Sequence, residues 1–481
     1  MEKTVQGETE LRLLYSERSS NNTQTPSNHA TIYRKLDVRI IPLAFLCYFL
    51  QFLDKVIINY ARIMGMESSL NMHGQDFSWM ATALFIAYAV AEFPQGFLIQ
   101  KFPISKILGL NILCWGILVC CSAASQDFAG MLALRTLLGA FEAVIGPALV
   151  LITSQFYTKR QATPRMGIWY CGLGLGQLVG GLISWAGQHG SRTSSFEGWR
   201  IMMLCLGICN LALAPAVVFI LPDTIGSASF LTPTEKEHVQ KILSQDRAGN
   251  GVKRFNKKGL VEALMDPAVW LLVLISVLTV IPSGVITSFS ASLIAGFGYD
   301  SKQAALLNMP SGAVSILATV LGTFAVLFDL PRWLSIVGLL IPAIIGGALM
   351  SFASGTQGGA LAGIYLVNFT IPPLALVYAL IGANIHGYTK KIVASAAVQI
   401  GFGIANIIGP QTFQAHEAPE YVSAKIVVLA VDAGAIVVAV LLRLLYGYRN
   451  KRRAHEVPDE SGLIEEDDLT DFTTRGFRYV Y

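Results

Sequence analysis

The stretch that decides the fold is RTLLGAFEAVIGPALVLITSQFYTKRQATPRMGIW, residues 135–169. Arg135 and Glu142 lie in its first, apolar part, where an ordinary soluble surface would not place them. They are seven residues apart, about two helical turns, so both point from nearly the same face. Gly139 lies between them on that face and leaves room for a neighbouring helix or a ligand. Charges buried in a membrane are costly and usually mark a transport path or a structural ion pair.

The end of this stretch predicts how the chain continues. The apolar run stops before Lys159, Arg160 and Arg165, and a new apolar segment begins at Met166. We therefore expect a membrane span with two buried charges, then a short basic loop, then a second span.

The composition of the whole chain favours a membrane protein. Of its 481 residues, 53% are hydrophobic and only 14% are charged, and the mean hydropathy is +0.54. A soluble protein of this length would expose too much apolar surface, whereas many long apolar segments indicate an integral, multi-pass membrane protein. The net charge of +4 is small, and we expect a lipid bilayer, not nucleic acid, to surround the chain.

Apolar segments long enough to cross about 30 Å of hydrocarbon set the architecture. Twelve are expected, at about 40–61, 79–99, 105–124, 128–151, 166–188, 200–221, 268–294, 303–328, 332–354, 358–383, 391–413 and 424–447. A long polar stretch divides them six and six. This layout resembles the major facilitator fold, an all-α membrane protein with two six-helix bundles and a substrate cavity between them.

Five regions follow from this layout. We expect a disordered tail at 1–36, an N-terminal bundle at 37–221, a linker at 222–266, a C-terminal bundle at 267–448 and an acidic tail at 449–481, disordered after Arg453. In the linker, Thr232 followed by Pro233 and Glu235 is a typical helix start. It predicts a short helix that runs to about Ser244.

Lysine and arginine in the loops predict the orientation. They gather on the side that holds both termini and the linker: Arg34, Lys35, Arg39, Lys101, Lys106, Lys159, Arg160, Arg165, Lys390, Lys391, Arg449, Lys451, Arg452 and Arg453. That side is therefore expected to be cytoplasmic, with the chain in the plasma membrane. Asn21 begins a glycosylation sequence, but on this side of the membrane we expect it to remain unmodified.

Span one contains two adjacent charges, Asp54 and Lys55. Neighbouring residues on a helix diverge by about 100°, so the two cannot face each other. Each needs a partner from another helix, or water. One hypothesis is that Lys55 attracts an anion while Asp54 takes part in proton coupling or gating. The other, held about equal, is that both form ion pairs that lock the bundles together.

Two more polar residues lie within the first bundle. Glu92, in span two, is deep enough to need a partner and is a candidate for proton coupling or gating. Gln177, in span five, lies among glycines at 172, 176 and 180, a spacing that lets helices approach closely. Gln177 could therefore bind substrate in the cavity, although a role in helix packing is favoured.

Three polar residues of the second half are further candidates. Asn384 and Asn406 lie inside apolar helices and could bind polar groups of a substrate or bridge helices. His386 lies close to the cytoplasmic end of span ten, where a proton-coupling role competes with the more ordinary role of a satisfied interfacial histidine.

Several of these motifs resemble those of the anion:cation symporters, a branch of the major facilitators, and within it the fungal allantoate permease-like group. The resemblance runs from about Arg34 to Tyr421. The matching segments are Leu53–Lys55, Glu92–Pro94, Arg135–Ala143, Tyr157–Arg160, Gly198–Arg200, Leu221–Asp223, Asn384–Lys391 and Asn406–Gln411. The resemblance implies proton-coupled uptake of a small organic anion, such as an allantoate-like ureide, a carboxylate vitamin or a related acid.

The chain also departs from the family pattern. Lys55 replaces an arginine, Ile57 and Asn59 stand at the places of an asparagine and a glycine, and Val144–Pro147 replace the usual phenylalanine, proline and glycine. These positions lie near the expected cavity, so the identity of the substrate is the least transferable property.

Arg135 and Glu142 have complementary expected roles. The guanidinium fork of Arg135 matches a carboxylate and stays charged, which favours it as the substrate ligand. Glu142 is the expected proton carrier, because burial disfavours the charged form of a carboxyl group. The alternative is that the two residues pair with each other or with neighbours for structure alone.

Other functional classes receive less support from the sequence. An enzyme would need a nucleophile with a base, or a metal cluster, and neither pattern is present in the sequence, so we expect no metal and no cofactor. An exporter of a secondary metabolite or drug, associated with a biosynthetic pathway, remains open and would be favoured by a broad aromatic cavity without a fixed cation. We expect a monomer that carries a small organic anion and protons.

Overall fold

The computed structural model describes residues 26–190, 197–248, 256–328, 330–352, 356–417, 421–454, 470–474 and 477–481. Asn21 lies outside these residues. Within them the regular structure is helical, and twelve helical segments are long and apolar enough to cross a membrane. The predicted all-α fold class and the predicted twelve spans are thus confirmed. Most edges differ by a few residues, but span one begins about ten residues earlier than predicted, at Ala30.

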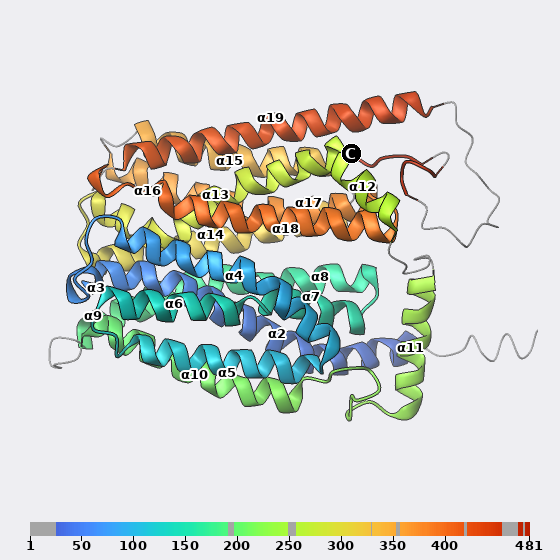
Figure 1. Ribbon diagram of the computed structural model, residues 1–481, viewed down its shortest axis with the longest axis horizontal. Coiled ribbons are helices and arrows are strands. Elements are labelled where there is room, and N and C mark those ends of the chain that lie inside the picture. Colours follow the sequence, from blue (N-terminus) through green and yellow to red (C-terminus); the bar gives the residue numbers. More distant parts are fainter. Residues whose placement is uncertain are drawn as a thin grey trace, which may run out of the picture.

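The first six spans pack as an N-terminal bundle in the lower half of Figure 1. Span four is divided into two helices near its middle, and so is span five. The helices are α2 (Pro26–Ile63), α3 (Met66–Ser69), α4 (Asp76–Lys101), α5 (Ile104–Ser122), α6 (Phe128–Glu142), α7 (Ile145–Phe156), α8 (Lys159–Tyr170), α9 (Gly172–Gly190) and α10 (Gly198–Ile220).

The linker between the bundles holds two helices, α11 (Pro233–Ala248) and α12 (Lys257–Met265). Thr232 N–H donates to Glu235 Oε2 at 2.9 Å and Glu235 N–H donates to Thr232 Oγ1 at 3.3 Å, a reciprocal cap that confirms the predicted helix start. Lys35 of α2 pairs with Glu235 at 2.7 Å and ties α11 to the first bundle. We call this end of the molecule the linker end.

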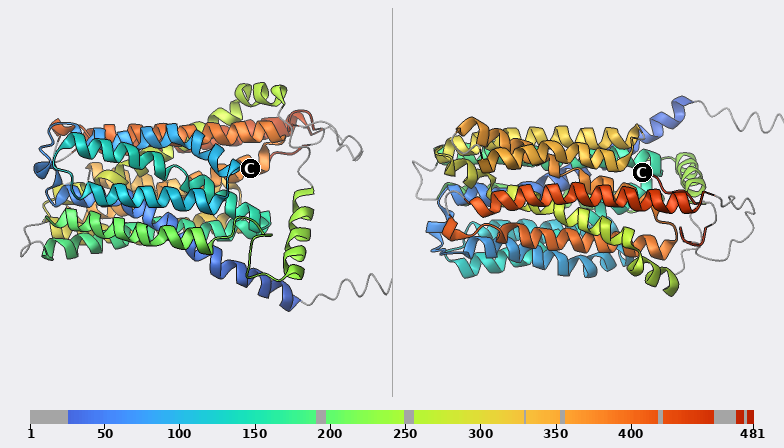
Figure 2. Two further views of the ribbon diagram at one scale, coloured as in Figure 1. Left: turned by 60° about the horizontal axis from the view of Figure 1, so that its bottom comes forward. Right: turned by 90° about the horizontal axis from the view of Figure 1, so that it is seen from above.

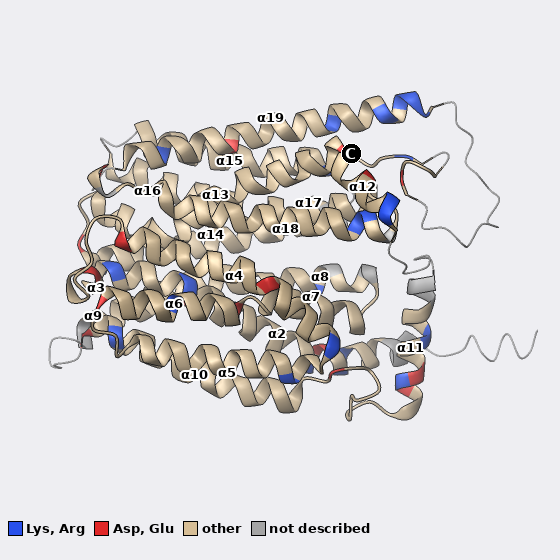
Figure 3. Cartoon of the chain, viewed as in Figure 1, with Lys and Arg blue, Asp and Glu red and all other residues tan. Residues whose placement is uncertain are grey.

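The last six spans form the C-terminal bundle in the upper half of Figure 1. Span ten is interrupted by a short 3₁₀ turn. The helices are α13 (Pro267–Gly296), α14 (Ser301–Leu327), α15 (Arg332–Phe352), α16 (Gln357–Val367), η1 (Asn368–Thr370), α17 (Pro373–Asn384), α18 (Tyr388–Gln411), η2 (Ala415–Glu417) and α19 (Val422–Arg452). Lys and Arg gather at the linker end of both bundles, on the right in Figure 3.

The structure corrects three expectations. The first helix begins at Pro26, so the predicted disordered tail to residue 36 is too long; Leu36 is fully buried. The basic stretch after residue 158 opens α8 and is not a loop, and Arg165 there pairs with Asp37 of α2 at 2.6 Å. The predicted disorder after Arg453 is wrong for residues 470–474 and 477–481, because Asp471 and Tyr479 are buried against the C-terminal bundle.

The glycines of α9 act as predicted, by letting helices approach closely. A Cβ atom at Gly172 or Gly176 would lie 3.0–3.1 Å from the backbone of α2. A Cβ atom at Gly174 would lie 2.4 Å from the carbonyl oxygen of Gly312 on α14. The helix is thus wedged between the two bundles, with small residues on both contacting faces.

Gly139 allows α6 to touch α4. A Cβ atom at this position would lie 2.1 Å from the carbonyl oxygen of Leu84, far inside van der Waals contact. The space that the sequence predicted beside Gly139 is therefore filled by a helix backbone. This contact fixes the depth at which α6 presents its charged residues.

The Gly139→Ala variant is expected to lose about 3 kcal/mol of stability or more, because the methyl group must force two helices apart. The matched control is Gly96→Ala on α4, where no atom outside the neighbouring backbone of α4 itself lies within 4 Å of the added Cβ atom. Thermal unfolding in detergent checks this: equal midpoints for the two variants would contradict the close packing.

Candidate functional site between the bundles

Two helices of the N-terminal bundle bring four charged side chains together. Asp54 and Lys55 lie on α2, and Arg135 and Glu142 lie on α6. Arg135 Nη1 is 3.8 Å from Asp54 Oδ2, and Lys55 Nζ is 3.7 Å from Glu142 Oε2. Each adjacent charge on α2 thus finds its own partner on another helix, as the geometry of span one requires.

These ion pairs are buried but incompletely satisfied. Asp54 and Glu142 are fully buried, the Arg135 side chain is 3% exposed and that of Lys55 13%. Among the described residues, no hydrogen-bond partner reaches Asp54 Oδ1, Arg135 Nε or either carboxylate oxygen of Glu142. Buried polar groups usually have partners. Each ion pair is therefore held by the attraction of opposite charges, while its unsatisfied atoms keep the capacity to bind something else.

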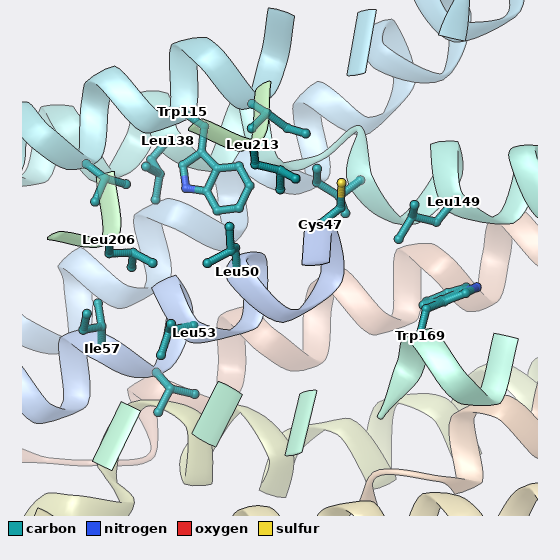
Figure 4. Packing of buried hydrophobic residues seen from close by; sticks show 14 of the residues in the cluster. Cys47, Leu50, Leu53, Ile57, Trp115, Leu138, Leu149, Trp169, Leu206 and Leu213 are labelled. Carbon is teal, nitrogen blue, oxygen red and sulfur yellow. The ribbon is translucent and has the colours of Figure 1, made fainter. Parts of the chain in front are cut away.

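Mostly apolar side chains pack against one side of Asp54. The indole Nε1–H of Trp115 donates to Asp54 Oδ2 at 3.3 Å. Figure 4 shows the Trp115 ring beside Leu138 and Leu213, with Leu50 and Leu206 close by. Met203 Sδ lies 3.6 Å from Arg135 Nη2. A rigid apolar wall therefore fixes one side of the charge cluster.

A break in span four exposes backbone beside Glu142. Helix α6 ends at Glu142, and α7 begins at Ile145. Pro147 lacks an N–H and cannot donate to the carbonyl four residues earlier. Gln51 of α2 donates its Nε2–H to the carbonyl oxygen of Glu142 at 3.1 Å, which supplies a partner at the break.

A pocket between the bundles lies in front of the two cations. Lys55 and Arg135 line it together with apolar side chains of α2 and α4, while Thr287 and Ser288 of α13 contribute hydroxyl groups from the C-terminal bundle. The apolar lining residues are Ile58, Met80, Ala81, Leu84 and Phe85.

Comparison with known proteins decides the family. The family model described as Major Facilitator Superfamily matches residues 44–410. The chain belongs to the Major Facilitator Superfamily. The xylose symporter XylE, a solved proton:xylose symporter, shares this facilitator's fold with a TM-score of 0.65, at 14% identity, over 85% of this chain and 95% of the other.

The relatives of this facilitator include several fungal transporters. It is 35% identical to the thiamine pathway transporter THI73 of Saccharomyces cerevisiae, over 94% of this chain and 86% of the relative. It is 32% identical to the allantoate permease of the same yeast, over 95% and 87%. The resemblance to the allantoate permease-like group is thus confirmed, and the chain is a transporter and not an enzyme.

Two other candidates of this facilitator lie outside the pocket lining. Gln177 is buried on α9, where the described residues offer its Nε2 no hydrogen-bond partner. Asn406 donates to the carbonyl of Phe402 on its own helix at 2.9 Å, and its Oδ1 lies 3.6 Å from where a Cβ atom of residue 284 would stand. Asn406 thus bonds within α18 and packs against α13.

The remaining candidates lie nearer the linker end. Glu92 is half-buried on α4 and interacts with Gln399 of α18 across the bundle interface. Asn384 hydrogen bonds with both backbone groups of Val480, and His386 packs against Phe477 with ring centroids 4.7 Å apart. Asn384 and His386 therefore contact the last described residues of the chain and do not line the pocket.

Sequence reasoning missed the residues that complete the site. Trp115, Gln51, Thr287 and Ser288 carry no charge and lie in apolar spans. Thr287 bonds the carbonyl of its own helix at 2.8 Å, as hydroxyl groups in membrane helices commonly do. The one available signal is the density of hydroxyl residues in the segment TSFSAS, 287–292.

Proposed function

We propose that this facilitator is a proton-coupled symporter of a small organic anion, either an allantoate-like ureide, a carboxylate vitamin or a related acid. The observation that carries the proposal is that Lys55 and Arg135 line a pocket between the bundles while their carboxylate partners stay 3.7 and 3.8 Å away. An anion that enters the pocket would contact Lys55 and Arg135. Each of these cations could exchange its present carboxylate partner for the anion. The hydroxyls of Thr287 and Ser288 lie on the other bundle and can complete the binding of polar groups.

Substrate binding is then an exchange of partners. Arg135 is 3.8 Å from Asp54, longer than a strong charge-assisted hydrogen bond of about 2.8 Å, so a substrate carboxylate can bind it more closely than Asp54 does. A proton on Glu142 would neutralise the partner of Lys55 and free that cation for the same anion. Anion and proton thereby favour each other's binding, which is the requirement for symport.

Alternating access would expose this pocket to each side in turn. We propose that the bundles rock about it, with the linker end in the cytoplasm, in a monomer in the plasma membrane. The clustering of Lys and Arg at the linker end supports this orientation.

Three side-chain hydrogen bonds join the two bundles at the end opposite the linker. Asn59 donates to Ser290 at 2.8 Å, Gln411 to Thr82 at 2.8 Å and Gln75 to Gln414 at 3.0 Å. These contacts support a state closed on the outer side, in which the pocket would open towards the linker end.

Arg62 adds cation–aromatic contacts to this closure. Its guanidinium carbon lies 4.6 Å from the ring centroid of Phe77 on its own bundle and 5.0 Å from that of Phe289 on the other. Its Nη2 also donates to the Tyr421 hydroxyl at 3.3 Å. Such cation–aromatic contacts contribute about 0.5–2 kcal/mol each.

The Arg62→Ala variant is expected to shift the population towards the outward-open state by roughly tenfold, the equivalent of about 1.4 kcal/mol. In a background without native cysteines, labelling of Ser288→Cys by an outside reagent would increase. The matched control is Glu67→Gln, which removes an ion pair to Arg62 within one bundle. Equal labelling in the Arg62→Ala variant and the parent would contradict the role of Arg62 in outer closure.

The exporter alternative receives less support from the pocket. A drug exporter was expected to have a broad aromatic cavity without a fixed cation, whereas the lining of this pocket includes two cations, Lys55 and Arg135. The charges favour an anionic cargo.

The experiment that tests the proposal is uptake into proteoliposomes. Purified protein would be supplied with radiolabelled allantoate, a carboxylate vitamin, an uncharged sugar and an organic cation, with and without an inward proton gradient. We expect accumulation of at least one anion that requires the gradient. Accumulation of only the sugar or the cation, or of an anion without any effect of the gradient, would overturn it.

A further inference from the structure

The last described residues of the chain occupy a built site at the linker end of the C-terminal bundle (Figure 1). We call residues 470–474 and 477–481 the docked segment. Figure 2 shows it, in red, lying against the end of the bundle beside the last helix. Its contacts are independent of the pocket and of the proposed cargo.

Charge anchors one end of the docked segment. Lys390 of α18 is fully buried between Asp266, at 3.0 Å, and Asp471 of the segment, at 2.8 Å. Arg449 of α19 pairs with Asp266 at 2.6 Å. Lys390 and Arg449 carry two positive charges, and Asp266 supplies only one negative charge. The charges therefore balance only when Asp471 is present. Without it, one carboxylate would serve two buried or half-buried cations, a costly arrangement.

The electrostatic environment of Asp266 agrees with this balance. Burial alone would raise the pKa of this carboxyl group, but the hydrogen bond from Arg449 and the charges of Lys390 and Arg449 hold the pKa below its ordinary value. Asp266 is thus ionised at neutral pH. Its single negative charge neutralises one of the two cations, so Asp471 is needed to neutralise the other.

Two asparagines bind the backbone of the docked segment. The Asn384 side chain donates to the Val480 carbonyl at 2.8 Å and accepts from the Val480 N–H at 2.7 Å. The Asn450 side chain likewise donates to the Tyr479 carbonyl at 2.9 Å and accepts from the Tyr479 N–H at 2.8 Å. The amide side chain has both a donor and an acceptor, so it can pair with an extended peptide as a neighbouring strand would.

Aromatic side chains fill the rest of the site. The Tyr479 ring is 3% exposed and stacks on Tyr446 of α19 with centroids 5.2 Å apart, while its hydroxyl donates to Asp471. Arg443 lies over the Tyr481 ring at 3.4 Å. Main-chain pairing combined with aromatic anchors is a common mode of peptide recognition.

We propose that this end of the C-terminal bundle is a peptide-binding site, and that the docked segment is its own releasable ligand. The site takes a peptide with one aspartate in a turn, followed eight residues later by a buried tyrosine. The bound segment clamps the linker ends of four spans, because it contacts the Arg332 N–H of α15, Asn384 of α17, Lys390 of α18 and Asn450 of α19. Lys390 in turn pairs with Asp266, the residue that caps α13.

The clamp also reaches the linker. Thr389, next to Lys390, accepts a hydrogen bond from the Asn256 N–H at 2.9 Å, and Gly259 of α12 packs against Thr389. Release of the segment would therefore loosen both the bundle end and the attachment of the linker that joins the two halves.

The test uses the full chain with a specific protease site inserted within residues 455–469. After cleavage and washing, we expect a lower thermal midpoint, and a synthetic peptide of residues 470–481 should restore it in a saturable way. A peptide with Asp471→Asn should need at least tenfold higher concentration. A fluorescent copy of the peptide detects exchange even where the cleaved segment stays bound.

The uncut protein should bind the fluorescent peptide at least tenfold more weakly, because its own segment is held at high local concentration. As a second measurement in the intact chain, Asp471→Asn should lower the midpoint, while Glu237→Gln, at an exposed position of α11, should not. The proposal is overturned if the peptide does not bind cleaved protein, if the two peptides act equally, or if exchange requires a second copy of the chain.

Discussion

Replacing Arg135 with alanine is expected to lower uptake of the anion by about 100-fold or more at low substrate concentration. Truncating one partner of a buried, hydrogen-bonded charge pair costs about 2–5 kcal/mol, and each 1.4 kcal/mol is a factor of about ten in affinity. Arg135→Lys keeps the charge but loses the fork, so it should retain part of the activity. Initial rates of radiolabelled uptake, normalised to protein in the membrane, measure both.

The control separates binding from structure. Arg135→Ala alone leaves Asp54 buried without its cation, which could impair folding for reasons unrelated to the substrate. The double variant Arg135→Gln with Asp54→Asn removes both charges together. If Arg135 binds the anion, the double variant folds and does not transport. If the pair is only structural, the double variant regains uptake and the binding role is wrong.

A second control concerns charge alone. Lys106 lies exposed at the linker end of α5, so Lys106→Gln removes one cation without touching the pocket. Its uptake should stay within about twofold of the parent, since surface charges far from a site are largely screened by salt. A large loss in this variant would indicate that general charge, and not the pocket, controls uptake.

The sequence predicted which helix faces carry the charges but not how they pair. The separation of Arg135 and Glu142 by two turns placed them on one face, and the adjacency of Asp54 and Lys55 required partners from elsewhere. The pairing depends on the depth at which α6 lies in the bundle, and the contact of Gly139 with Leu84 of α4 is one determinant of that depth. Helical periodicity predicts which face of a helix a residue lies on. It does not predict how far along the bundle axis that residue lies relative to the neighbouring helices.

Other candidates show where local sequence is insufficient. Asn384 and His386 have the chemistry of a binding site, and they do bind, but their partners are Val480 and Phe477 of the same chain. The acidic composition between Glu456 and Asp468 led to an expectation of disorder for the whole tail. The aromatic residues that follow it, in the segment FRYVY, were the available signal for packing.

Replacing Glu142 with glutamine is expected to uncouple transport from the proton gradient. A gradient of one pH unit is worth about 1.4 kcal/mol per proton and can support roughly tenfold accumulation when one proton accompanies each anion. The glutamine side chain cannot ionise, so the variant should equilibrate the anion without accumulating it. Accumulation in proteoliposomes, at several imposed pH gradients, measures this directly.

The same variant should still bind and exchange substrate. Lys55 loses a carboxylate 3.7 Å away and becomes more available to the anion, so the affinity should be equal or higher. Exchange of internal for external anion, which needs no net proton movement, therefore distinguishes an uncoupled carrier from a misfolded one. Glu235→Gln, which removes the linker carboxylate paired with Lys35, is the matched control and should keep accumulation. Gradient-dependent accumulation that survives in Glu142→Gln would place the proton elsewhere, with Glu92 at the bundle interface as the next residue to test.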